Sequence, residues 1–187
     1  MPAFIVEGRA EQKIVQRLCP SAKVMILECN GDHVELGAIA KKIHSLTQTC
    51  GNRHHPIVVQ LDRERRATSA QEIEALLLLE LASLGLDVRQ FRIGITDRDL
   101  ESWILYGTDE DGMFLRDCRA SVPNEYEGSA GAYVLGTRLA RRGGSYHKTT
   151  VGVDMFCRLS AVALAAKSES FRRFLAQLDV DCYWKTV

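Results

Sequence analysis

The sequence lacks the long apolar runs that membrane anchors and secretory signals require. Its most apolar segment, EALLLLELASLGL, is interrupted by acidic residues and falls short of the ~20 apolar residues of a membrane-spanning helix. The apolar stretch FIV near the start is too short for the core of a signal peptide. We therefore expect a cytoplasmic protein without a membrane segment.

Paired cysteine motifs are also missing. The spacing shows neither a CxxC nor a His–Cys cluster, which argues against a structural zinc site. Thiols in a chain without a signal peptide are typical of the cytoplasm, so we expect free thiols that behave as small buried hydrophobes. The six cysteines are Cys19, Cys29, Cys50, Cys118, Cys157 and Cys182.

An excess of positive charge is absent as well. With 24 basic and 24 acidic residues, the formal net charge is zero. Because nucleic-acid binders of the histone or repressor kind are usually basic overall, any contact with nucleic acid must come from a local patch or be helped by a bound metal. There is no P-loop and no GxGxxG, which argues against a nucleotide-binding α/β enzyme.

What the first hundred residues do contain is an alternation of strand and helix patterns. The predicted strands are PAFIV, AKVMILE, HPIVVQLD and LDVRQFRIGI. The predicted helices are AEQKIVQRL, VELGAIAKKIHSLTQ, residues 72–84 behind a capping box at Ser69–Glu72, and DLESWILYG. HPIVVQLD is apolar on both faces, as a central parallel strand should be. This order predicts a Rossmann-like α/β fold, with a central parallel sheet of about four strands flanked by helices.

The pattern changes after Gly107. Residues 107–145 are rich in Gly, Asp, Arg and Ser and predict a long excursion. The chain then ends in helices, the last being SESFRRFLAQL with apolar residues at helical spacing. With no repeat and no clear linker, we predict one domain over 1–187, made of an α/β core at 1–106 and a long loop with C-terminal helices at 107–187.

Acidic residues follow three of the predicted strands. The carboxyl ends of parallel strands meet at one edge of a sheet, where ligands bind. Carboxylates a few ångströms apart repel one another unless a cation lies between them, and oxygen-only ligands suit Mg²⁺ or Mn²⁺. The predicted metal ligands at this edge are Glu7, Glu11, Asp62, Glu64 and Glu101.

Each acid also has a simpler explanation. Glu64 can pair with a neighbouring arginine in DRERR, and Asp97 and Asp99 resemble turn and N-cap residues. Asp62 is the hardest to explain in this way, because it directly follows the apolar run IVVQL. The favourable interaction of acids with a helix N-terminus stays an alternative for Glu7, Glu11 and Glu101.

A local basic loop lies in TRLARRGGSYHK. Its two glycines let the backbone approach a ligand closely, and basic residues beside an aromatic one suit contacts to a nucleic-acid backbone. A solvated run of charges is the alternative. The predicted nucleic-acid-binding residues are Arg138, Arg141, Arg142, Tyr146 and Lys148.

Two motifs carry a resemblance to a known family. VEGRAE places Glu7 and Gly8 at the end of the first predicted strand, with Glu11 following, and LDRE places Asp62 and Glu64 after the third. In order and placement they resemble the TOPRIM signature, the domain shared by topoisomerases, bacterial primases and OLD-type nucleases. That signature has a Glu-Gly and then an Asp-x-Asp. Here the last acid is glutamate, which keeps the charge and is one methylene longer.

The resemblance extends over nearly the whole chain. DLESWIL, YHK followed by TTVG, and SESFRRF resemble small stand-alone TOPRIM-like proteins of bacteria, often encoded beside an AAA-type ATPase. It implies a TOPRIM-like sheet with a C-terminal helical extension, a Mg²⁺ or Mn²⁺ cofactor, and hydrolysis of phosphodiester bonds, with DNA favoured over RNA. It further implies a partner ATPase and a role in defence against phage or foreign DNA. Homo-oligomerisation is left open.

The resemblance also implies roles for individual residues. Glu7 would be a metal ligand or the general base, Asp62 and Glu64 would be ligands, and Glu11 a ligand or a neighbour of one. Lys148 would stabilise charge on the transferring phosphate, a role that OLD-type nucleases give to a lysine. An exposed lysine near a helix start is its alternative. No tyrosine can be argued as a topoisomerase nucleophile, so hydrolysis is favoured over strand passage.

Two further functional hypotheses stay open. The glutamate at position 64 and the small size of the chain also permit a non-catalytic, TOPRIM-shaped binding or regulatory subunit of an ATPase complex. A phosphate-handling α/β enzyme is a third and weaker hypothesis.

Overall fold

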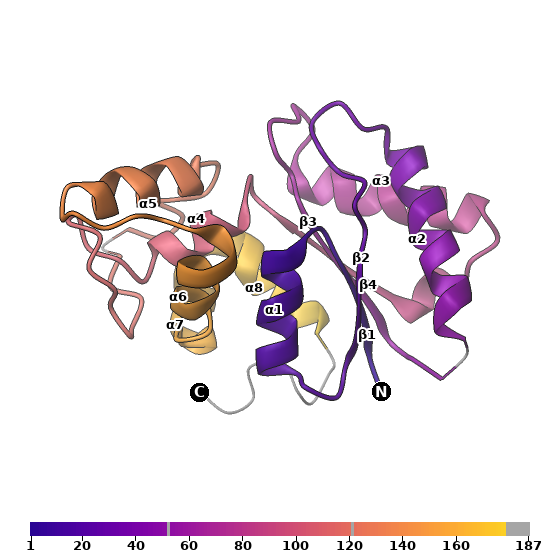
Figure 1. The fold of residues 1–187 in the computed structure, drawn as a ribbon. Coiled ribbons are helices and arrows are strands. Elements are labelled where there is room, and N and C mark those ends of the chain that lie inside the picture. Colours follow the sequence, from indigo (N-terminus) through magenta and orange to yellow (C-terminus); the bar gives the residue numbers. More distant parts are fainter. Residues whose placement is uncertain (52, 121, 179–187) are drawn as a thin grey trace.

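A parallel β-sheet forms the centre of the molecule. The computed structural model describes residues 1–51, 53–120 and 122–178. In this part of the chain all strands of the sheet are parallel, in the order β2-β1-β3-β4 (Figure 1). The strands are β1 (Ala3–Val6), β2 (Lys23–Ile26), β3 (Ile57–Asp62) and β4 (Phe91–Thr96). The predicted α/β class and Rossmann-like sheet are therefore confirmed.

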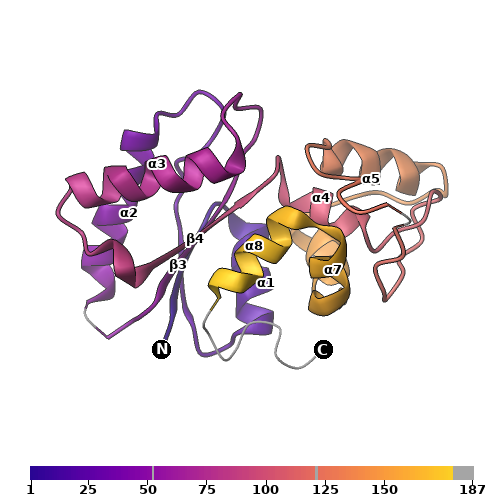
Figure 2. The ribbon, with the colours of Figure 1, turned by 180° about the vertical axis from the view of Figure 1, so that it is seen from behind.

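Helices cover both faces of this sheet (Figures 1 and 2). On one face lie α2 (Leu36–Cys50) and α3 (Ala70–Ser83), and on the other α1 (Arg9–Leu18) and α8 (Glu169–Gln177). Residues of β3 alternate between the two apolar cores, because successive side chains of a strand point to opposite faces. All of β3 is buried, as expected for a strand that is apolar on both faces, and the predicted capping box at Ser69 and Glu72 is present.

A further group of helices lies beyond α1 and α8, away from the sheet (Figures 1 and 2). Trp103 on α4 joins this group to the core. Its Nε1 donates to Ser170 Oγ at 2.8 Å, and its ring lies 5.7 Å from that of Phe174 on α8. Trp103 is fully buried. The elements of the group are α4 (Leu100–Leu105), α5 (Gly131–Ala140), the π-helix η2 (Lys148–Gly152), α6 (Val153–Phe156) and α7 (Ala161–Lys167).

Two predicted elements differ from the structure. The fourth strand begins at Phe91 rather than near residue 86, because Asp87 caps a short 3₁₀ helix, η1 (Val88–Gln90). The excursion at 107–145 is not irregular throughout, since it contains α5. Leu135 of α5 is buried against the core, and the small residues around it had hidden the helical pattern.

The cysteines and apolar helices refine two further expectations. Cys29, Cys50, Cys118 and Cys157 are free thiols, whereas Cys19 is disulfide-bonded, so the expectation of free thiols is wrong there. Cys182 falls outside the described residues. In the described ranges no single helix is long and apolar enough to cross a membrane. One pair of helices bent by 96°, Lys148–Phe156 and Ala161–Lys167, reaches that length and apolar composition only when the two are taken together.

The contact between β4 and α8 generates a prediction about stability. A Cβ atom at Gly94 would overlap the ring of Phe174, which is itself fixed by stacking on Trp103. We expect Gly94→Ala to lower the free energy of unfolding by about 1–3 kcal/mol through overpacking, measured by urea denaturation.

Gly136 supplies the matched control. A Cβ atom built there meets nothing within 4 Å, and it lies inside α5, so Gly136→Ala should leave stability unchanged or raise it by up to about 1 kcal/mol. Equal stability of Gly94→Ala and the wild type would show that α8 moves freely against β4.

Candidate metal centre

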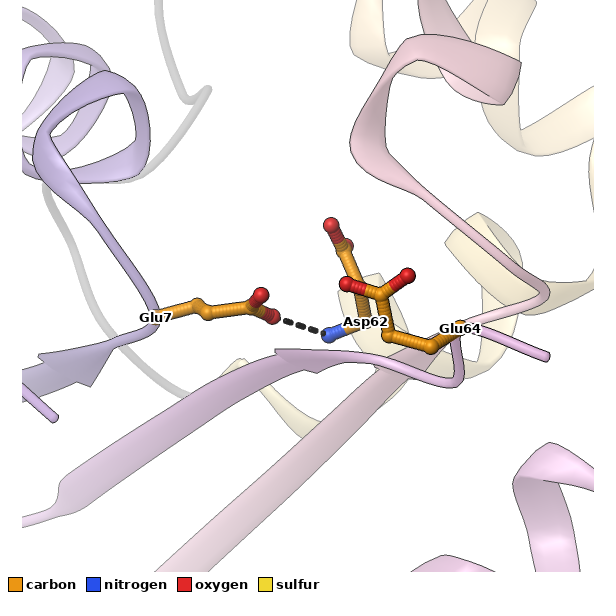
Figure 3. Close-up of side chains that lie close together, drawn as sticks. All are labelled: Glu7, Asp62 and Glu64. Atoms are coloured by element: carbon orange, nitrogen blue, oxygen red, sulfur yellow. Dashed lines mark hydrogen bonds between the residues drawn. The ribbon is translucent and has the colours of Figure 1, made fainter. Parts of the chain in front are cut away.

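Three carboxylates converge at the carboxyl-terminal edge of the sheet. Glu7 follows β1, Asp62 is the last residue of β3, and Glu64 comes two residues later. One oxygen of each lies within 4.8 Å of the others (Figure 3). These residues, here called the triad, are the part of the predicted ligand set that comes from the ends of β1 and β3.

The carboxylate of Glu7 is held in place by two donors. Its Oε2 accepts hydrogen bonds from the backbone N–H of Asp62 at 3.0 Å (Figure 3) and from Asn30 Nδ2 at 2.7 Å. The Asn30 amide also lies 3.1 Å from the carbonyl oxygen of Asp62, and Arg66 donates to Asn30 Oδ1 at 3.2 Å. Burial raises the pKa of Glu7, against the lowering effect of these hydrogen bonds.

Asp62 is the most deeply placed member of the triad. It is 5% exposed, and its Oδ1 accepts a hydrogen bond from the Thr96 hydroxyl at 2.7 Å. Burial raises its pKa well above the usual range, and the neighbouring charge of Glu7 raises it further. A carboxylate kept at a position that disfavours its charged form is typical of a site that binds a cation.

Glu64 is positioned by its backbone. Its φ of 59° lies in the left-handed region, which is uncommon for a residue other than glycine and often marks functional sites. Its N–H donates to the carbonyl of Arg98 at 2.8 Å, which extends the contact between the ends of β3 and β4. Among the described residues, Glu64 forms no ion pair with a neighbouring arginine of DRERR, and Arg63 pairs instead with Asp97 at 2.9 Å.

Glu11 and Glu101 form a separate group around Lys148. The ammonium nitrogen of Lys148 lies 3.0 Å from Glu11 Oε1 and 3.6 Å from Glu101 Oε2. It also lies 3.6 Å from Asp62 Oδ2, so Asp62 belongs to both groups. The structure thus divides the predicted ligands between the triad and this second set.

The two other acids at this edge, Asp97 and Asp99, make contacts within the protein, and the N-cap predicted for Asp99 is confirmed. Asp99 caps α4, accepting from the N–H of Ser102 at 2.9 Å, and also accepts from the N–H of Gly131 at 3.0 Å. Burial, with the charge of Glu101, raises the pKa of Asp99 to about 6. Asp97 is the ion-pair partner of Arg63.

Two of the predicted nucleic-acid-binding residues, Arg138 and Tyr146, are half-buried. Arg138 donates to Thr108 Oγ1 at 3.1 Å and lies over the ring of Tyr126, and Tyr146 donates its hydroxyl to Glu101 at 3.0 Å. These contacts hold both side chains against the protein, and their binding to nucleic acid stays a prediction. Arg141 and Arg142 are exposed just after α5.

Three residues that shape the site belong to none of the predicted motifs' functional positions. Asn30 donates to Glu7, Arg66 holds Asn30, and Thr96 donates to Asp62. Only their positions could have indicated them. Asn30 follows β2 and Thr96 is the last residue of β4, and both strands end at this edge of the sheet. Because Asn30 and Thr96 are neutral, no pattern of charge indicates either of them.

The arrangement fits a divalent cation. The triad offers hard oxygen donors on a rigid sheet edge, the donor chemistry that small divalent cations prefer. Among the described residues, no basic side chain forms an ion pair with Glu7 or Glu64. A cation held by Glu7, Asp62 and Glu64 would therefore offset charge that the protein leaves unbalanced.

This imbalance predicts opposite effects of Asp62→Asn with and without metal. In EDTA the variant should be as stable as the wild type or melt about 2–4 °C higher, because it removes a buried charge while Lys148 keeps Glu11 and Glu101 as partners. In MnCl₂ the wild type should gain thermal stability and the variant should not. The measurement is thermal unfolding followed by circular dichroism.

The exposed Asp111 provides a control, since Asp111→Asn should melt like the wild type in both solutions. Clear destabilisation of Asp62→Asn in EDTA would instead show that Asp62 serves mainly to anchor Lys148.

Comparison of the chain with protein-family models, with curated proteins and with solved structures gives no match. The centre is therefore interpreted from its own geometry and from the motifs of the sequence.

Proposed function

We propose that the protein is a nuclease of the TOPRIM type, a hydrolase of phosphodiester bonds that depends on Mg²⁺ or Mn²⁺. The observation that carries this proposal is the convergence of Glu7, Asp62 and Glu64 at one edge of a parallel sheet, with Lys148 alongside. The order of the motifs VEGRAE and LDRE supports the same family. Mg²⁺ and Mn²⁺ suit such oxygen ligands and also recruit substrate phosphates.

In this proposal the residues of the centre have separate roles in the reaction. Glu7, Asp62 and Glu64 would hold the ion, which when bound acts as a Lewis acid and lowers the pKa of water. The hydrogen bonds from Asn30 and from Asp62 N–H fix the orientation of Glu7. Its second oxygen stays available to bind the ion or to accept a proton. The side chain of Lys148 is 39% exposed, so its charge can also face a phosphate.

The proposed substrate is nucleic acid, with DNA favoured over RNA. Because the chain has no net charge, binding must rely on local features. The exposed Arg141 and Arg142 and the metal itself would supply the positive charge that phosphates require. A partner AAA-type ATPase and a role in defence against phage or foreign DNA are proposed on the family resemblance.

One observation favours a second candidate, a non-catalytic binding or regulatory subunit. Lys148 already offsets part of the negative charge of Glu11, Asp62 and Glu101, which lets this edge fold without metal. Such a subunit would keep the shape of the domain and bind little or no divalent ion, so metal binding separates the two candidates.

The first test is calorimetric titration of MnCl₂ into the purified protein. We expect saturable binding that weakens by more than about tenfold in Glu7→Gln and in Asp62→Asn. Glu110→Gln changes an exposed acid and should bind like the wild type. If the wild type binds no manganese, even with an oligonucleotide added to supply phosphate ligands, the nuclease proposal fails and the second candidate is favoured.

The second test is cleavage of labelled DNA and RNA in MnCl₂. Lys148→Met should slow cleavage by about 10²–10³-fold, because the variant removes a charge that stabilises the transition state. Glu110→Gln should cleave like the wild type, and EDTA should abolish cleavage by every variant. Cleavage that persists in EDTA would contradict a metal-dependent mechanism.

A further inference from the structure

The second set of acids, Glu11, Asp62 and Glu101, already surrounds a cation. The three distances from the Lys148 ammonium to their oxygens are 3.0, 3.6 and 3.6 Å. Glu11 and Glu101 are only 3% and 1% exposed, so neither can rely on water to stabilise its charge. Removing the ammonium would leave buried carboxylates facing one another, which is strongly unfavourable.

The position of Lys148 is fixed from several directions. It opens the π-helix η2, a rare geometry that is frequent at functional sites. Lys13 on α1 donates to the carbonyl of Thr149 at 3.0 Å. Two residues earlier, the hydroxyl of Tyr146 donates to Glu101 and lies so close to Gly152 that a Cβ there would overlap it. The ammonium is therefore built into the fold rather than carried on a loose surface side chain.

Asp62 is shared by the two groups of carboxylates. It belongs to the triad with Glu7 and Glu64, while its Oδ2 faces Lys148. A shared carboxylate between two neighbouring cation positions is the arrangement of a two-metal centre, in which the ions lie ~3.5–4 Å apart. Here one of the two positions already holds an ammonium group.

We propose that Lys148 is a built-in cation that takes the place of a second divalent ion, so that the centre binds one ion, at Glu7, Asp62 and Glu64. This inference rests on the metal centre of the proposed function. A divalent ion among Glu11, Asp62 and Glu101 would meet the positive charge of the ammonium at short range and be repelled. Three carboxylates within 3.0–3.6 Å of the nitrogen favour the charged form of the Lys148 side chain.

Once the charge of Lys148 is removed, Glu11, Asp62 and Glu101 become a set of buried oxygen ligands without a cation. A variant such as Lys148→Met should therefore accept a second divalent ion where the wild type accepts one. Lys148→Arg keeps the charge and should still bind one.

The test is the number of Mn²⁺ ions bound by the full chain, measured by calorimetry and by the electron paramagnetic resonance of bound Mn²⁺. We expect one ion with an isolated-ion spectrum in the wild type and in Lys148→Arg. We expect two ions in Lys148→Met, with the spectrum of an exchange-coupled pair, because both would share Asp62. Lys41→Met, at an exposed lysine of α2, is the matched control and should bind one.

The possible outcomes separate this inference from the proposed function. Two ions in the wild type would overturn the inference and leave the metal-dependent nuclease standing, whereas none would overturn both. A folded Lys148→Met that binds a single ion would also overturn the inference. If circular dichroism shows that Lys148→Met does not fold without metal, the count in the wild type and in Lys148→Arg still decides, because neither depends on that variant.

Discussion

The ammonium group of Lys148 among buried carboxylates is the interaction on which this edge of the molecule depends. Glu11, Asp62 and Glu101 come from three separate elements and would repel one another in the low-dielectric interior. Lys148 allows them to lie together before any ligand binds. The centre is thus formed without a ligand, while Glu7 and Glu64 have no ion-pair partner among the described residues.

The parallel sheet supplies the rigidity of the centre. Because β1 and β3 are neighbours in register, the side chain of Glu7 reaches the backbone N–H of Asp62 directly. The ends of β3 and β4 are joined beyond the sheet by the bond from Glu64 to Arg98, which holds Glu64 in its left-handed conformation. A site built on strand ends in this way needs little rearrangement to bind an ion.

The group of helices beyond α1 and α8 contributes further residues to the centre, from α4 and η2. Glu101 lies in the first turn of α4, Tyr146 lies just before η2, and Lys148 is the first residue of η2. Trp103, packed on α8 and bonded to Ser170, ties α4 to the sheet. The C-terminal half of the chain is therefore part of the site. It supplies Lys148, which pairs with Glu11 and Asp62 of the first half.

The sequence by itself determined the fold class and the acids at the strand ends. The alternation of apolar strands and amphipathic helices was sufficient for a parallel sheet, and such a sheet necessarily brings Glu7 and Asp62 to one edge. The helix α5 could not be predicted, because Gly131 and Gly136 weaken its pattern and packing on α4 stabilises it.

Only the tertiary structure decided how the charges are shared. The motif YHK predicts a functional Lys148 but not its ion pairs with buried acids, and nothing near Arg138 or Tyr146 indicates their bonds to Thr108 and Glu101. Their roles depend on partners distant in the chain, since Lys148 meets Glu11 across more than a hundred residues. Local patterns report which face of an element is apolar, whereas the pairing of buried charges follows from packing in three dimensions.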